Sequence, residues 1–179
     1  LVAHVLPNAD KPFKVTIVAR GQTAGHTRYL PEEDRQMWTK HQFEDMLAAA
    51  LGGRVAEEVV FNEVTTGAGN DLEQATNIAQ SMVTQYGMSE KLGPRTFGKR
   101  EQMVFLGREI SQQRDYSNDV AETIDDEIHD IINRAYESAQ KAITETQLSK
   151  YLLENETVES DVLEQIWSTP PSAEPAPAG

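Results

Sequence analysis

One carboxylate lies in phase with the apolar side of a predicted helix, and two kinds of chemistry fit it. At about 100° per residue, Asp71 shares one narrow stripe with Ala75, Ile78 and Met82. An unpaired buried charge is costly, so this carboxylate needs a partner. The free N–H groups of the first helical turn are one partner, and periodicity alone favours them. A metal cation held across a packed interface is the other.

Composition limits the ligands available to such a cation. The sequence has no cysteine and four histidines, so disulfides and thiolate metal sites are excluded and His, Asp and Glu remain. For every histidine, a surface or packing role is the favoured interpretation. His26 lies in a predicted strand, and His129 lies on an acidic helix where we expect it to be solvated.

Helices must position Asp71. Thr39 is predicted to cap a helix that Gly52-Gly53 interrupts, either as a break or as a close helix crossing. Residues 65–70 are predicted to form a loop with two glycines. The helix that follows, which carries Asp71, is expected to end at Gly87.

The second half of the chain is also predicted to be helical. A long helix begins at Ser117 or Asn118, with apolar residues at helical spacing along it. Shorter helices are expected over residues 148–153 and 162–167, with residues 154–160 as the turn between them. This half contains no group suited to catalysis, so its expected role is packing.

A small sheet is predicted near the N-terminus. Residues 14–20 alternate as in a strand, and residues 26–30 form a second strand that ends before Pro31 and is expected at a sheet edge. Residues 1–6 resemble the last turns of a helix stopped at Pro7. The chain is therefore expected to begin inside an element.

These patterns predict a mainly α fold with a small two- to three-stranded β element near the N-terminus. Residues 1–167 are expected to form one domain, with a metal-site half over residues 1–116. The long helix and the C-terminal helices occupy residues 117–167. Residues 168–179, rich in Pro and Ala, are expected to be a disordered tail.

Charge is distributed unevenly along the chain. The net charge is −13, and residues 101–179 carry 17 acidic and 5 basic side chains. An acidic half repels phosphate, so nucleic acid is excluded as an expected partner, and solvated helix faces explain the charge. No stretch approaches the roughly 18 consecutive apolar residues of a membrane span, so any anchor is expected outside these residues.

Ordered motifs make the chain resemble the peptidase domains of FtsH-type proteases. They include Leu51-Gly-Gly-Arg54, Ala56-Glu-Glu-Val59, the segment Thr65–Thr76 and the segment Tyr86–Pro94. The similarity covers roughly residues 1–165, in order and without large gaps. Any one of these matches is weak, but so many in order make chance similarity improbable.

The resemblance implies a zinc-dependent endopeptidase with Asp71 as the third zinc ligand. In that family an H-E-x-x-H helix supplies two His ligands and a Glu that activates water. That motif would end two residues before Leu1, and the sequence contains no His-Glu dipeptide. The chain is therefore expected to be a truncated piece that is inactive alone. His4 would lie about 140° around the helix from the second His ligand and point away from the metal.

The resemblance also implies the substrates and partners of the parent protein. An upstream module that binds ATP would feed unfolded or misassembled membrane and soluble proteins to a homo-hexamer. Membrane segments outside this chain would anchor it, in the plasma or inner membrane of a bacterium, with the peptidase domain facing the cytoplasm. Strand addition would let an extended substrate pair with the predicted edge strand, and an ordinary edge strand capped by a neighbour is equally favoured. The residues of that strand are His26, Thr27, Arg28, Tyr29 and Leu30.

Two other interpretations stay open. A peptidase-like homologue can keep the fold and the ring-forming surface without the catalytic motif, and the coding sequence before Leu1 distinguishes it from a protease. An acidic helical binding module is the second alternative. It predicts that Asp71 is exposed to solvent.

Overall fold

The computed structural model describes residues 1–19, 25–29, 37–98, 116–143 and 147–168. In chain order its elements are α1 (Val2–Val5), β1 (Pro12–Thr16), β2 (His26–Tyr29), α2 (Lys40–Phe61), the 3-10 turn η1 (Thr66–Ala68), α3 (Gly69–Thr84), α4 (Asn118–Ala142), α5 (Gln147–Asn155), β3 (Thr157–Glu159) and α6 (Ser160–Ser168). The mainly α fold with a small β element is therefore confirmed. Leu30 and the predicted tail from residue 169 onward lie outside the described residues.

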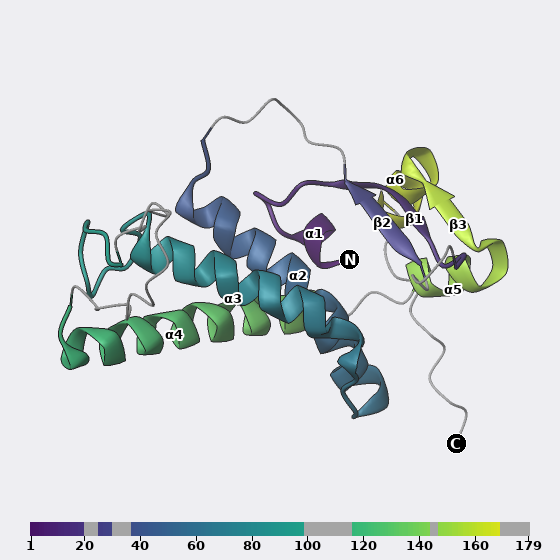
Figure 1. Ribbon diagram of the computed structural model, residues 1–179. Coiled ribbons are helices and arrows are strands. Elements are labelled where there is room, and N and C mark those ends of the chain that lie inside the picture. The colour runs from purple at the N-terminus through teal and green to yellow at the C-terminus, as the bar shows by residue number, and fades with distance from the viewer. Residues whose placement is uncertain (20–24, 30–36, 99–115, 144–146, 169–179) are drawn as a thin grey trace, which may run out of the picture.

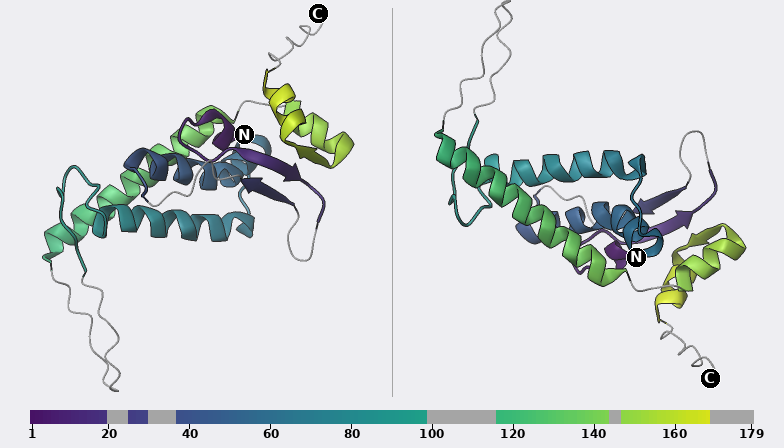
Figure 2. Two further views of the ribbon diagram at one scale, coloured as in Figure 1. Left: turned by 90° about the horizontal axis from the view of Figure 1, so that it is seen from above. Right: turned by 90° about the horizontal axis from the view of Figure 1, so that it is seen from below.

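Three long helices, α2, α3 and α4, pack against one another and form the larger part of the molecule (Figure 1). The two further views show α3 and α4 on either side of α2 (Figure 2). Ala48, Ala75 and Ala139 are buried where these helices meet. Small side chains at such positions let helix axes approach closely.

Helix α2 begins at the predicted cap and runs through its glycine pair without a break. The Thr39 hydroxyl accepts from Gln42 N, and Gln42 Oε1 accepts from Thr39 N at 2.9 Å, which makes a reciprocal capping box. A Cβ placed on Gly52 would lie 3.0 Å from Cγ2 of Val2. Of the two interpretations of the glycine pair, close approach of another helix is therefore the right one at Gly52, and the helix is α1.

Helix α3 buries the apolar stripes that were predicted from spacing. Ala75, Ala79, Met82 and Val83 are buried in the main core. The helix ends at Thr84, before the predicted stop. Gly87 has φ +62°, and a Cβ there would lie 3.2 Å from backbone atoms of the following loop. The C-cap residue is Gln85, two positions before the predicted Gly87, and the left-handed turn at Gly87 lets Met88 N donate back to Met82 O at 2.9 Å in the last turn of the helix.

Helix α4 starts at the predicted Ser117 cap, whose hydroxyl accepts from Val120 N at 3.4 Å. Ile124, Ile131 and Ala135 face α2 and α3 in one core, and the acidic residues of α4 lie on its other faces with the exception of Glu127, which is buried. Long acidic helices of this kind are stabilised by the apolar face that they bury.

The three strands form one antiparallel sheet in the order β2-β1-β3. Strand β1 stops at Thr16, short of the predicted residue 20, because both of its partners end there in register. The prediction of a plain turn over residues 154–160 is wrong, since β3 lies within it. Three residues are too few to show an alternating pattern, and the partner strand is about 140 residues away in sequence.

Two hydrophobic clusters hold the described residues together. The larger one joins α2, α3 and α4 with Val2 of α1. The smaller one lies under the sheet and gathers Leu148, Leu152, Val158 and Leu163, with Val15 and Leu1 packed against it. Helix α1 lies between the two clusters (Figure 1), so its two ends contact both parts of the molecule.

Among the helices of the described residues, none combines the length and the apolar composition that a membrane crossing requires.

Candidate active site

Asp71 lies in the first turn of α3 and lines a cavity of about 390 Å³. The first turn is where the positive end of the helix dipole favours a carboxylate. The cavity is also lined by Ala3 of α1, Tyr29 of β2 and Met46 of α2, so four elements converge there. Asp71 is half-buried, which does not fit the solvent-exposed side chain that a simple acidic binding module predicts.

Tyr29 places a phenol beside the Asp71 carboxylate. Partial burial raises the pKa of Tyr29, and the negative charge of Asp71 raises it further. A phenol is protonated at neutral pH even with its ordinary pKa of 10.0, so Tyr29 has an O–H that can donate a hydrogen bond. The cavity lining thus includes a carboxylate acceptor and a neutral donor.

The loop before α3 is fixed by a second carboxylate, Glu57 of α2. Its two oxygens accept from Thr65 N at 2.9 Å and from Thr65 Oγ1 at 3.0 Å. Thr65 Oγ1 in turn accepts from Gly67 N at 3.0 Å and caps η1. Because η1 continues directly into α3, Glu57 sets where the first turn with Asp71 begins. The motif Ala56-Glu-Glu-Val59 includes this residue, but its spacing does not predict the contact with Thr65.

Strand β2 lies at the outer edge of the sheet, as predicted from the sequence. His26 is half-buried and Thr27 and Arg28 are exposed, while Tyr29, which also lines the cavity, is 46% exposed. Its inner edge pairs with β1, and the described residues place no strand on its outer edge. Substrate binding by these residues stays a prediction, as does the role of Leu30.

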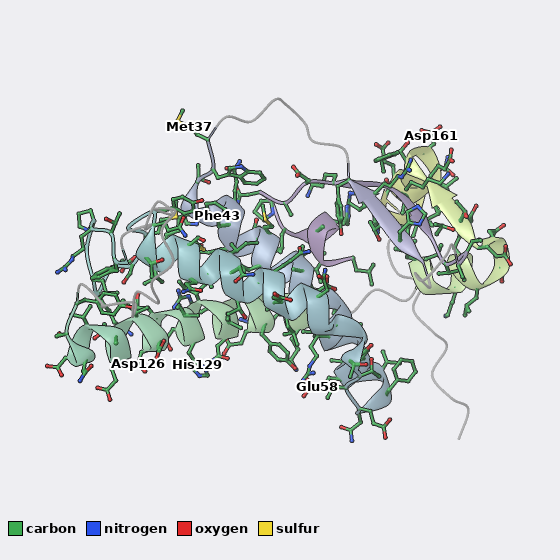
Figure 3. All side chains as sticks on the ribbon, viewed as in Figure 1. Met37, Phe43, Glu58, Asp126, His129 and Asp161 are labelled. Atoms are coloured by element: carbon green, nitrogen blue, oxygen red, sulfur yellow. The ribbon has the colours of Figure 1, made fainter. Side chains whose placement is uncertain are left out.

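The four histidines are not gathered at this cavity. The His4 ring stacks on Trp167 and lines a different cavity. His41 is exposed and contacts Glu44 through Nδ1 at 3.2 Å. His129 is exposed on the outer face of α4, as expected, with Nε2 2.8 Å from Asn133 Nδ2 (Figure 3).

Within the described residues, no three His, Asp or Glu side chains converge closely enough to hold a metal ion. Asp10 is a second carboxylate in the lining of the cavity, and the assignment of Asp71 as the third zinc ligand stays a prediction. A carboxylate oxygen in a partly buried cavity is suitable for zinc, which accepts Asp oxygens together with His nitrogens. The lining of the same cavity includes Ala3 of α1.

Comparison with known proteins gives a consistent family. The model of peptidase family M41 matches residues 1–166. The chain is 53% identical over 175 residues to ATP-dependent zinc metalloprotease FtsH 1 of Sphaerobacter thermophilus, and 50% identical over 175 residues to FtsH 1 of Thermomicrobium roseum. It is 47% identical over 174 residues to ATP-dependent zinc metalloprotease FtsH of Thermotoga maritima. These matches cover 94–95% of this chain and 27–28% of each relative, so the chain spans about a quarter of the length of these relatives.

Proposed function

The chain belongs to peptidase family M41, and on this premise we propose that it is the zinc-dependent endopeptidase domain of an ATP-dependent protease. The observation that carries the proposal is the position of Asp71. Its carboxylate lies in the first turn of α3 and lines one cavity together with Ala3 of α1 and Tyr29 of β2. This arrangement supports a metal ligand on α3 close to a substrate strand.

Asp71 would bind the metal through its carboxylate, and the two His ligands would come from an H-E-x-x-H motif on the helix that leads into α1. When bound, zinc makes a coordinated water acidic enough to attack a peptide bond near neutral pH. Glu57 holds the loop before α3 and so orients Asp71. Tyr29 keeps a protonated phenol at the cavity, where it can donate to a substrate carbonyl.

Strand β2 would orient the substrate. An extended polypeptide that adds to its outer edge pairs through main-chain groups, so its side chains need not match a fixed sequence. Such pairing suits a protease for unfolded or misassembled membrane and soluble proteins. The proposal includes an upstream ATPase module that delivers these chains, a homo-hexameric assembly, and a membrane anchor outside these residues with the peptidase domain in the cytoplasm.

The test is Asp71→Asn in the full-length protein. Asparagine keeps the shape of the side chain and removes its charge, so we expect zinc and proteolysis to be lost while folding and ATP hydrolysis persist. The matched control is Asp126→Asn, which alters an exposed carboxylate on the outer face of α4 (Figure 3). Unchanged zinc content and casein cleavage in Asp71→Asn would refute the site.

The 179 residues alone are expected to cleave nothing, because they contain no His-Glu dipeptide. If the purified chain cleaves casein and EDTA abolishes that cleavage, this expectation is contradicted. The same observation favours a second candidate function, a peptidase-like scaffold without catalysis. The coding sequence before Leu1 decides between them: an H-E-x-x-H motif there supports the protease, and its absence supports the scaffold.

A further inference from the structure

The C-terminal end of α1 needs hydrogen-bond donors that the helix itself does not supply. The amides of His4 and Val5 donate to Leu1 O at 2.9 and 3.2 Å, and Leu6 N donates to Val2 O at 3.1 Å. The next carbonyl along the helix, that of Ala3, would accept from the residue four positions on. That residue is proline, which has no N–H.

The carbonyl of His4 also lacks a donor from the helix, but for a different reason. The His4 carbonyl would accept from Asn8 N, but this amide donates instead to Asp45 Oδ2 on α2 at 2.8 Å, and Asn8 Nδ2 reaches the same oxygen at 3.0 Å. The chain therefore leaves the helix at Pro7 and is tied to α2. The last carbonyls of α1 are left to donors from outside the helix.

The ammonium group of Lys11 takes that place. Its Nζ lies 2.9 Å from His4 O, 2.9 Å from Leu6 O and 3.5 Å from Ala3 O. An ammonium has three donors, and a positive charge at a helix C-terminus is favoured by the helix dipole. Lys11 is half-buried, so water screens these contacts less than it would at a fully exposed cap.

We propose that Lys11 is a positioning residue for the active site, because it fixes the end of the helix that forms one wall of the cavity. The inference rests on the proposed function, in which the residues preceding α1 carry the two His ligands. Ala3 lines the cavity that Asp71 lines, and Val2 packs on Gly52 of α2. Since metal sites lose affinity when their ligands shift by a fraction of an ångström, a loosened α1 weakens zinc binding.

A second contact holds the C-terminal turn of α1 and does not depend on Lys11. The His4 ring stacks on the Trp167 indole with centroids 3.7 Å apart and planes 10° from parallel. Trp167 belongs to α6, so the end of α1 contacts the smaller cluster on one side while Lys11 binds its carbonyls. Replacing Lys11 leaves this stacking and the Asn8–Asp45 contacts in place, and the fold is expected to persist.

The experiment measures zinc affinity by chelator competition in the full-length protein with Lys11→Met, which keeps the aliphatic stem and removes the charge. We expect the affinity to fall about five- to tenfold, the size of effects seen when groups behind metal ligands are altered. Lys11→Arg is expected to restore most of it, because a guanidinium also donates to carbonyls. ATP hydrolysis, measured alongside, is expected to stay unchanged.

Lys14→Met is the matched control. Lys14 lies three residues further on and pairs with Glu159 at 2.7 Å, away from α1, so zinc affinity is expected to stay at the wild-type value. Zinc affinity of Lys11→Met within twofold of wild type, or a Lys11→Arg variant as weak as Lys11→Met, would overturn the inference. Asp71→Asn distinguishes failure of the proposed function from failure of the role of Lys11. If Asp71→Asn retains zinc, the proposed function fails. If Asp71→Asn loses zinc and Lys11→Met retains it, only the role of Lys11 fails.

Discussion

The two hydrophobic clusters of this protein differ in where their residues come from. The larger cluster is made of faces of long continuous helices, with Leu47, Met82 and Ile131 contributed by α2, α3 and α4. The smaller cluster joins Val158 and Leu163, near the end of the chain, to Val15 near its beginning. The candidate ligand Asp71 belongs to a helix of the larger cluster, and the candidate substrate strand belongs to the sheet over the smaller one.

We expect the larger cluster to be the more rigid part of the molecule and the sheet over the smaller cluster to be the more mobile part. A metal ligand must keep its place, and it sits on a helix whose inner face is fully packed. An edge strand that accepts substrate must exchange partners, and regions with few buried apolar contacts open most readily. The following predictions test this division, beginning with the largest expected effect.

Leu51→Ala is expected to destabilise the whole described fold. Leu51 is 1% exposed in the larger cluster, so truncation leaves a cavity and lowers the free energy of unfolding by about 2–5 kcal/mol. Chemical denaturation followed by far-UV circular dichroism measures it. Leu153→Ala is the control, because Leu153 is 79% exposed, and equal losses in the two variants would show that the larger cluster is not the main core.

Leu163→Ala removes the same atoms from the smaller cluster, where Leu163 is fully buried. We expect local opening of β3 and α6 in place of global loss, because few other residues share that core. Hydrogen exchange should therefore quicken at the amides of β3 while those of α3 and α4 keep their protection. Uniform acceleration along the chain would mean that the two clusters unfold as one unit.

Glu127 links stability to pH within the larger cluster. Burial by itself would raise the pKa of its carboxyl, but hydrogen bonds from Ser89 (2.6 Å) and Lys91 (3.0 Å), with the charge of Lys91, hold the pKa below its ordinary value of 4.5. The unfolded chain then binds the proton at a higher pH than the folded chain does. The resulting stability is present above about pH 4.5 and is lost as pH falls through the lowered pKa.

Glu127→Gln is therefore expected to lower the free energy of unfolding at pH 7 by about 1–3 kcal/mol. It should also flatten the decline of stability below pH 4.5. Urea denaturation at a series of pH values checks both effects. Asp130→Asn removes the exposed partner of the same lysine, 3.0 Å away, and is expected to change little. A pH dependence identical to wild type in Glu127→Gln would remove Glu127 as the linked group.

Glu159→Gln is expected to have the smallest effect. Its ion pair with Lys14 joins β3 to β1 at the surface, where solvent and salt screen the attraction. The melting temperature should stay within experimental error of wild type at physiological salt. A clear loss that disappears at high salt would show that charge, and not the buried side chains beneath, holds the third strand.

The helices and their caps were predictable because their signals are local. Thr39 and Ser117 cap their helices through side chains that lie next to the elements they start, and the stripes of α3 follow from spacing alone. Strand β3 was not predictable, since Thr157, Val158 and Glu159 gain strand geometry only by pairing with distant β1. The meaning of the glycine pair likewise depended on which helix would approach it.

The candidate site divides in the same way. Asp71 could be singled out because a carboxylate in an apolar stripe is visible in the sequence, and the family resemblance gave it a role. The clamp from Glu57 and the cap from Lys11 depend on the path of the chain between elements. Pro7 is a sequence signal for the cap from Lys11, because its missing N–H leaves a helix carbonyl without a donor. The spacing from Pro7 to Lys11 does not identify that donor.

Strand β1 pairs with β3 through residues about 140 positions later, which has a consequence for synthesis on the ribosome. Helices α2 and α3 are complete long before the third strand emerges, and α4 precedes it with only α5 between them, so the helices are free to pack first. Until then β1 has one unsatisfied edge, and a neighbouring nascent chain offers the same kind of strand. Translation speed between the codons of α4 and those of β3 thereby determines how long the half-built sheet is exposed to mispairing.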